Sequence, residues 1–137
     1  MYLFPFIALE NIDSKSPYGG SVLEQWIAEI KASSDPRELG MILIHNGIVR
    51  ATSKDGKSVK RMYLSYDSER LNSLITEYRK KEGIVAIKAW INEGNLKVGD
   101  DIMYVLVAGR LRTDVLPTFE ELISKIKKEV VSENEFF

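Results

Sequence analysis

Five basic side chains stand at positions where they could do chemistry. Arg50 ends the first long predicted strand, and Arg110 and Arg112 directly follow a strand that we expect to be buried. Lys127 and Lys128 lie on the last predicted helix. Arginine binds phosphate and carboxylate groups through paired hydrogen bonds, and a partly desolvated lysine can act as a nucleophile or as a general acid or base. Because scaffolds often place functional side chains where buried strands end, the pattern predicts a site for anions and amine chemistry.

The two lysines also have a plainer interpretation. Lysines in the last turn of a helix interact favourably with the negative end of the helix dipole. Charged faces of helices usually contact nothing but water. The spacing of Lys127 and Lys128 therefore leaves two alternatives open, an active site or a solvated helix end.

Several other kinds of chemistry are excluded by composition. The chain has no cysteine, which removes disulfides, thiolate metal sites and thiol nucleophiles and fits a cytoplasmic location. His45 is the only histidine, so a serine–histidine pair or a histidine-rich metal site would depend on it. We expect a lone histidine in a strand to be packed or paired locally. With 19 Lys and Arg against 20 Asp and Glu, there is no basic excess for binding nucleic acid.

The elements that would position the basic residues belong to one α+β domain. With 137 residues, 45% of them hydrophobic, the chain has the size and composition of a single globular domain. Residues 102–108 are apolar on both faces, which is typical of a central strand. The order of the elements predicts an antiparallel or mixed sheet backed by helices. We expect strands at 40–52, 58–66, 84–91 and 102–108, a turn at 92–100, and helices from Ser21 to Asp35, at 67–82 and from near Pro117.

Short local signals support these boundaries. Ser21 and Glu24 form a capping-box pattern at the start of the first helix. Gly47 interrupts an apolar run, which indicates a β-bulge or a close approach of the backbone. Gly83 is placed as the cap of the helix at 67–82. These signals predict where the strands and helices begin and end.

The ends of the chain have a different character from the core at residues 21–131. Residues 1–20 read as an arm or loop, and residues 132–137 as a flexible tail. The apolar residues 1–9 contain Pro5 and lack a basic region, so we expect an edge strand or a partner-contact arm rather than a targeting segment. No apolar stretch approaches the roughly 20 residues of a membrane span, so a membrane partner is not expected.

Three sequence blocks resemble the catalytic (large) subunit of molybdopterin synthase. Residues 40–50, Gly-Met-Ile-Leu-Ile-His-Asn-Gly-Ile-Val-Arg, resemble that family's hydrophobic strand closing in Gly-x-Val-Arg. Residues 94–102, Gly-Asn-Leu-Lys-Val-Gly-Asp-Asp-Ile, resemble its glycine turn before the buried strand. Arg112, the last helix and Lys127 follow in the order that the family has. The resemblance extends over most of the chain, in the same order and spacing.

The resemblance implies a fold, an activity and partners. The fold would be an α/β-hammerhead, in a homodimer whose subunits accept the Gly-Gly C-terminus of a small ubiquitin-like sulfur carrier. The reaction would be a sulfur transfer from the carrier's thiocarboxylate to cyclic pyranopterin monophosphate, forming the dithiolene of molybdopterin without a metal or other cofactor. Lys127 would be the catalytic lysine, and Arg50 and Arg112 would bind the anionic substrate. Arg110 and Lys128 are candidate substrate-binding residues because they lie beside them in sequence.

The chain departs from the family at three places, and two alternatives follow. Ile91 and Asn92 replace a His-Arg pair, Leu111 replaces the histidine before Arg112, and no lysine follows Lys128. The first alternative is therefore a catalytically silent relative, a dimeric module that binds a carrier, a pterin or another partner. The second is a structural interaction domain that makes contacts through its two apolar ends.

Overall fold

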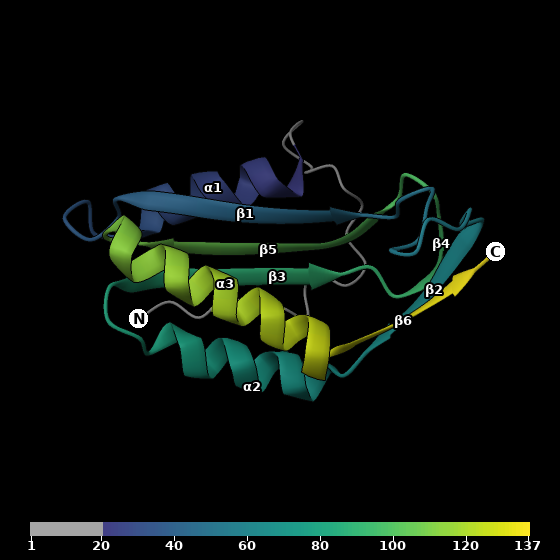
Figure 1. Cartoon of the computed structure of the whole chain (residues 1–137). Helices are drawn as coiled ribbons and strands as arrows, with labels where there is room; N and C mark the ends of the chain where they lie inside the picture. The colour runs from purple at the N-terminus through teal and green to yellow at the C-terminus, as the bar shows by residue number, and fades with distance from the viewer. Residues whose placement is uncertain (1–20) are drawn as a thin grey trace.

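The computed structural model describes residues 21–137. This part of the chain contains three helices and six strands. The strands form two sheets, with the strand orders β1-β5-β3 and β4-β2-β6 (Figure 1). Every strand pairing within them is antiparallel, which confirms the predicted α+β class. The elements are α1 (Val22–Ser33), β1 (Met41–Ile48), β2 (Arg61–Tyr66), α2 (Ser68–Arg79), β3 (Ile84–Ile91), β4 (Gly94–Lys97), β5 (Asp101–Gly109), α3 (Arg112–Glu129) and β6 (Val131–Phe136).

The larger sheet is built around β5, which lies between β1 and β3. Residues 103–109 of this strand are buried, and this confirms the central strand predicted from its unbroken apolar run. Alternate residues of a strand point to opposite faces, so β5 contributes to two cores. Val105 and Val107 pack with α2 and α3, whereas Leu106 and Ala108 pack with α1. The sheet is thus covered by α1 on one face and by α2 and α3 on the other (Figure 1).

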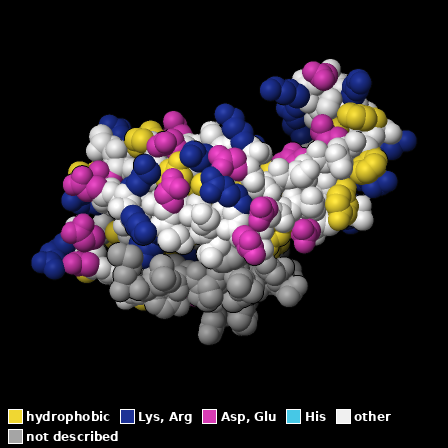
Figure 2. Space-filling view, turned by 90° about the horizontal axis from the view of Figure 1, so that it is seen from below, with side chains coloured by type: hydrophobic (Ala, Val, Ile, Leu, Met, Phe, Trp, Pro, Cys, Tyr) yellow, Lys and Arg dark blue, Asp and Glu magenta, His cyan; other side chains and the backbone are white. Residues whose placement is uncertain are grey.

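The smaller sheet corrects the prediction of a flexible tail at residues 132–137. All of these residues except the last, Phe137, belong to β6, which pairs with β2 along its length, from Val131 opposite Tyr66 to Phe136 opposite Arg61. Residues 132–136 of β6 are exposed, and they carry no apolar alternation from which a strand could be recognised. Together with β2 and β4, this strand forms a lobe that projects from the body of the molecule (Figure 2).

The helices agree in part with the predicted bounds, and the largest differences are at the end of α2 and the beginning of α3. Ser21 accepts a hydrogen bond from the backbone N–H of Glu24, which confirms the predicted cap of α1. Helix α3 begins at Arg112 rather than near Pro117, because the buried Val115 anchors an additional first turn. Helix α2 ends at Arg79 rather than at residue 82.

The glycines and loops agree in part with the predictions. The register between β1 and β5 shifts at Gly47, which confirms the predicted bulge. Gly83 has a φ of 77°, but it lies in the turn after α2 and not at the helix cap, because α2 ends earlier. The segment predicted as a turn at residues 92–100 contains the short strand β4, paired with β2. The predicted arm at residues 1–9 lies outside the described residues.

Candidate functional site

Lys127 and His45 lie near each other, on α3 and on β1. His45 follows Met41 and Leu43 at alternate positions, and these two pack into the core that α3 covers. Ile126 is fully buried in the same core, which fixes the last turn of α3 against the sheet. Burial, and after it the nearby positive charge of Lys127, lowers the pKa of the His45 imidazole. The charge of an exposed lysine therefore acts on a half-buried, neutral imidazole.

Arg50 follows the end of β1. The preceding Val49 is buried, and its N–H donates to the carbonyl of Asp100 at 2.9 Å, so the chain is held at the larger sheet up to that residue. The Arg50 guanidinium donates to the carbonyls of Thr52 (3.0 Å) and Ser53 (3.1 Å). Both acceptors are neutral, and no carboxylate among residues 21–137 forms an ion pair with Arg50. Its positive charge is therefore available to an anion.

Arg112 lies at the opposite end of the sheet from Arg50. In the antiparallel register, Met41 at the start of β1 stands opposite Gly109 at the end of β5. Arg112 is the first residue of α3, whereas Lys127 is in the last turn. Since a helix rises about 1.5 Å per residue, roughly 22 Å separate these two positions. The structure therefore does not bring Arg112 together with Arg50 and Lys127 within one chain.

Arg110 is already paired with carboxylates. Its Nε lies 3.3 Å from Oδ2 of Asp114, and a terminal nitrogen lies 3.7 Å from Oε1 of Glu82. Its backbone N–H donates to the carbonyl of Gly83 at 2.8 Å. These contacts join the end of β5 to α3 and to the turn after α2. They favour a structural role for Arg110 over substrate binding.

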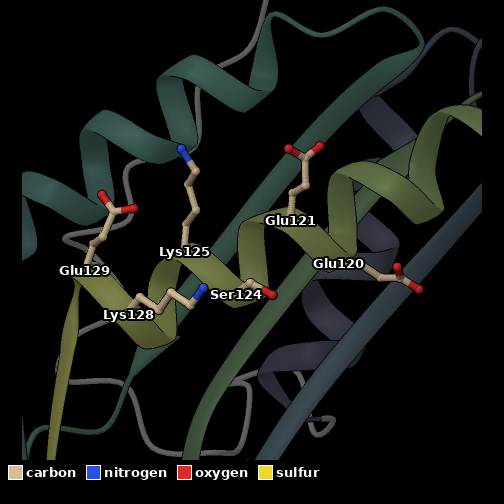
Figure 3. Close-up of a pocket in the computed structure, with 6 residues that line it drawn as sticks. All are labelled: Glu120, Glu121, Ser124, Lys125, Lys128 and Glu129. Carbon is tan, nitrogen blue, oxygen red and sulfur yellow. The ribbon is translucent and has the colours of Figure 1, made fainter.

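Lys128 belongs to another face of α3 than Lys127, because neighbouring residues on a helix point about 100° apart. It lines a shallow pocket of about 440 Å³ on the exposed side of the helix (Figure 3). Three of the six lining side chains are acidic and two are basic, so the pocket has no excess of positive charge for an anion. The pocket is lined by Glu120, Glu121, Ser124, Lys125, Lys128 and Glu129. Lys127 is not among them.

The candidate site thus consists of the exposed Lys127 and the neutral imidazole of His45, with Arg50 two residues after the end of β1. Among residues 21–137, no group of three or more His, Asp or Glu side chains is arranged to hold a metal ion. No helix in the same stretch is both long and apolar enough to span a membrane. Sequence reasoning gave His45 no role beyond local packing. The available signal was its position in the strand: His45 alternates with Met41 and Leu43, and alternate residues of a strand share a face, so a core-facing side was indicated.

Comparison with known proteins gives one family match and one relative of similar sequence. The sequence matches the family described as MoaE protein over residues 22–129. It is also 30% identical over 95 residues to the uncharacterized protein MJ0717 of Methanocaldococcus jannaschii, which covers 66% of this chain and 80% of that protein.

Solved structures with the same fold have lower sequence identity. The structure of molybdopterin synthase from Staphylococcus aureus is similar with a TM-score of 0.68 and 20% identity, over 83% of each chain. A complex of subunits 1 and 2 of the molybdopterin-converting factor from Helicobacter pylori gives 0.66 and 18%, over 83% of this chain and 75% of the other. Molybdopterin cofactor biosynthesis protein E from Burkholderia multivorans gives 0.66 and 21%, over 82% and 79%. At these identities the likeness shows the fold.

Proposed function

Because the chain belongs to the MoaE protein family, we propose that it is the catalytic subunit of a molybdopterin synthase. It acts in molybdenum cofactor biosynthesis. The proposed reaction moves sulfur from the thiocarboxylate of a small carrier protein to cyclic pyranopterin monophosphate, in the cytoplasm. The observation that carries the proposal is the family match over residues 22–129, which includes Arg50, Arg112 and Lys127.

Lys127 is the proposed catalytic residue. It is exposed on the last turn of α3, and it makes no hydrogen bond or ion pair with the other described residues. Its amine is therefore free to face the thiocarboxylate at the end of a carrier tail. Arg50 is the proposed anion-binding residue, because its guanidinium contacts only neutral carbonyls within the described chain. A pterin phosphate requires such a charge-assisted partner.

Arg112 fits the same site only in a homodimer. It lies roughly 22 Å along α3 from Lys127, too far for both to contact one substrate within a chain. In a twofold dimer, each chain meets the same surface of its partner. We therefore assign Arg112 to the site of the neighbouring protomer. The complex of two subunits from Helicobacter pylori supports a small carrier subunit as a second partner.

The first test is a reconstituted reaction. The purified protein is mixed with a thiocarboxylated Gly-Gly-ended carrier and cyclic pyranopterin monophosphate, and molybdopterin is measured. We expect Lys127→Ala to abolish product formation. Lys125→Ala is the matched control, because Lys125 lies on the same helix but lines the pocket on its exposed side (Figure 3). Absence of product with a cognate carrier, or equal activity of the two variants, would contradict the proposal.

A catalytically silent binding module is the second candidate. Its support is the stretch 131–136, Val-Ser-Glu-Asn-Glu-Phe, which contains no lysine although the resemblance implies a second essential lysine in the corresponding segment. This candidate predicts that the carrier binds and that no product forms. Calorimetric titration with the carrier, run on the samples used in the activity assay, separates the two functions.

A further inference from the structure

The imidazole of His45 has a polar atom without a partner. Its Nε2 is buried, and no group among the described residues forms a hydrogen bond with it. A buried nitrogen without a partner is unfavourable, because it loses its contact with water and gains nothing in return. Such an atom in a native structure calls for an explanation, and a bound or moving partner is one.

The position of the ring is fixed by the backbone beside it. Nε2 lies so close to Gly47 that a Cβ atom there would come within 3.2 Å of it. The ring therefore extends along β1 towards the bulge, past which the chain leads to Arg50. The absence of a side chain at Gly47 provides the room for it. The imidazole thus lies against the backbone of Gly47, three residues before Arg50 in the chain.

Burial and the nearby charge of Lys127 keep the ring neutral. From α3, Lys127 is the group whose charge acts on it, and from β5 the residue opposite His45 is the apolar Val105. Burial is the main cause of the lowered pKa, and the Lys127 charge is the second. No carboxylate among the described residues contributes to the lowered pKa of His45. A neutral imidazole has one nitrogen with a proton and one that accepts a hydrogen bond.

We propose that His45 is a positioning residue for Lys127, whose ammonium group donates one N–H to Nε2 and is thereby directed towards the substrate. The inference rests on the proposed catalytic role of Lys127. The lysine side chain is long, exposed and unpaired, so it can turn towards the ring. Protonation of the imidazole removes the acceptor and places a second positive charge beside the amine. Positioning is therefore lost as the pH falls through the pKa of His45.

The first experiment does not require enzymatic activity. His45 is the only histidine, so a ¹H–¹⁵N spectrum of the imidazole region contains signals from this ring alone. We expect the proton on Nδ1, Nε2 as the acceptor, and a pKa that rises towards the ordinary value of 6.5 in Lys127→Met. Lys125→Met is the control and should leave the titration unchanged. A proton on Nε2 at neutral pH, or an unchanged pKa in Lys127→Met, would overturn the inference.

The second experiment measures turnover. His45→Phe keeps a ring and loses the acceptor, whereas His45→Gln keeps an acceptor that does not titrate. We expect His45→Phe to lower kcat about tenfold with little change in KM for the carrier, as for the loss of one hydrogen bond to a charged group. His45→Gln should recover most of the rate and lose the acid limb of the pH profile.

The two experiments separate the inference from the proposed function. If the wild-type protein turns over and His45→Phe keeps both the rate and the acid limb of the pH profile, the positioning role is refuted. Without any turnover in the wild-type protein the proposed function fails, while the imidazole spectra still decide whether His45 and Lys127 interact.

Discussion

A shared active site makes a quantitative prediction about mixed dimers. Within one chain, roughly 22 Å of helix separate Arg112 from Lys127. If each site takes Lys127 from one protomer and Arg112 from the other, Lys127→Ala and Arg112→Ala are each inactive as homodimers. After unfolding and joint refolding in equal amounts, random pairing makes about half of the dimers mixed. Each mixed dimer has one intact site out of two, so the mixture should recover roughly a quarter of the wild-type activity.

The assay is product formation per protomer, with two different affinity tags to isolate the mixed dimer. Tandem purification should double the specific activity to roughly half of the wild-type value, since each isolated dimer keeps one intact site of two. The control mixes Lys127→Ala with Arg50→Ala. Because we assign these two residues to the same protomer, no intact site can form and the activity should stay at background. Verified mixed dimers that remain inactive in the first mixture, or that become active in the control, would refute the assignment.

Three further predictions concern stability and pH. Gly109→Ala should destabilise the protein by about 3 kcal/mol in urea unfolding, because a Cβ there would lie 2.3 Å from the carbonyl oxygen of Gly83. An unchanged stability would show that the end of β5 and the turn before β3 can move apart without cost. Glu29→Gln should cost about 1 kcal/mol in the same assay, since its half-exposed carboxylate is an ion-pair partner of the buried Lys88 ammonium group; an unchanged midpoint would mean that the pair contributes nothing. The lowered pKa of His45 means that the unfolded chain binds more protons just below pH 6.5, so the free energy of unfolding should fall as the pH drops from there through the folded-state pKa. His45→Phe should remove this slope, and a slope that persists would assign it to other groups.

Local patterns in the sequence were sufficient to predict several elements of the fold. The apolar run at residues 102–108 predicted a central strand because only a strand buried on both faces is apolar throughout. Ser21 predicted the start of α1, since its hydroxyl can satisfy a backbone N–H that the helix leaves free. Gly47 predicted the bulge at the end of β1. Each of these features depends on residues within a few positions of one another.

Other elements were decided by contacts with distant residues. Pro117 lies inside α3, because the burial of Val115 against the sheet outweighs the usual preference of proline for the start of a helix. Strand β6 consists mainly of exposed polar residues, so its side-chain pattern does not predict a strand. Its backbone hydrogen bonds come from pairing with β2, which is distant in the sequence.

For the candidate site too, some features could be predicted from the sequence and others depended on the tertiary structure. The sequence alone determined which residue types are available, and with no cysteine and a single histidine it directed attention to Arg50, Arg112 and Lys127. Only the tertiary structure decided that Arg112 lies far from the other two and that the charge of Lys127 acts on the imidazole of His45. Separation along a helix and adjacency across a sheet depend on how elements pack, and no local pattern encodes that packing.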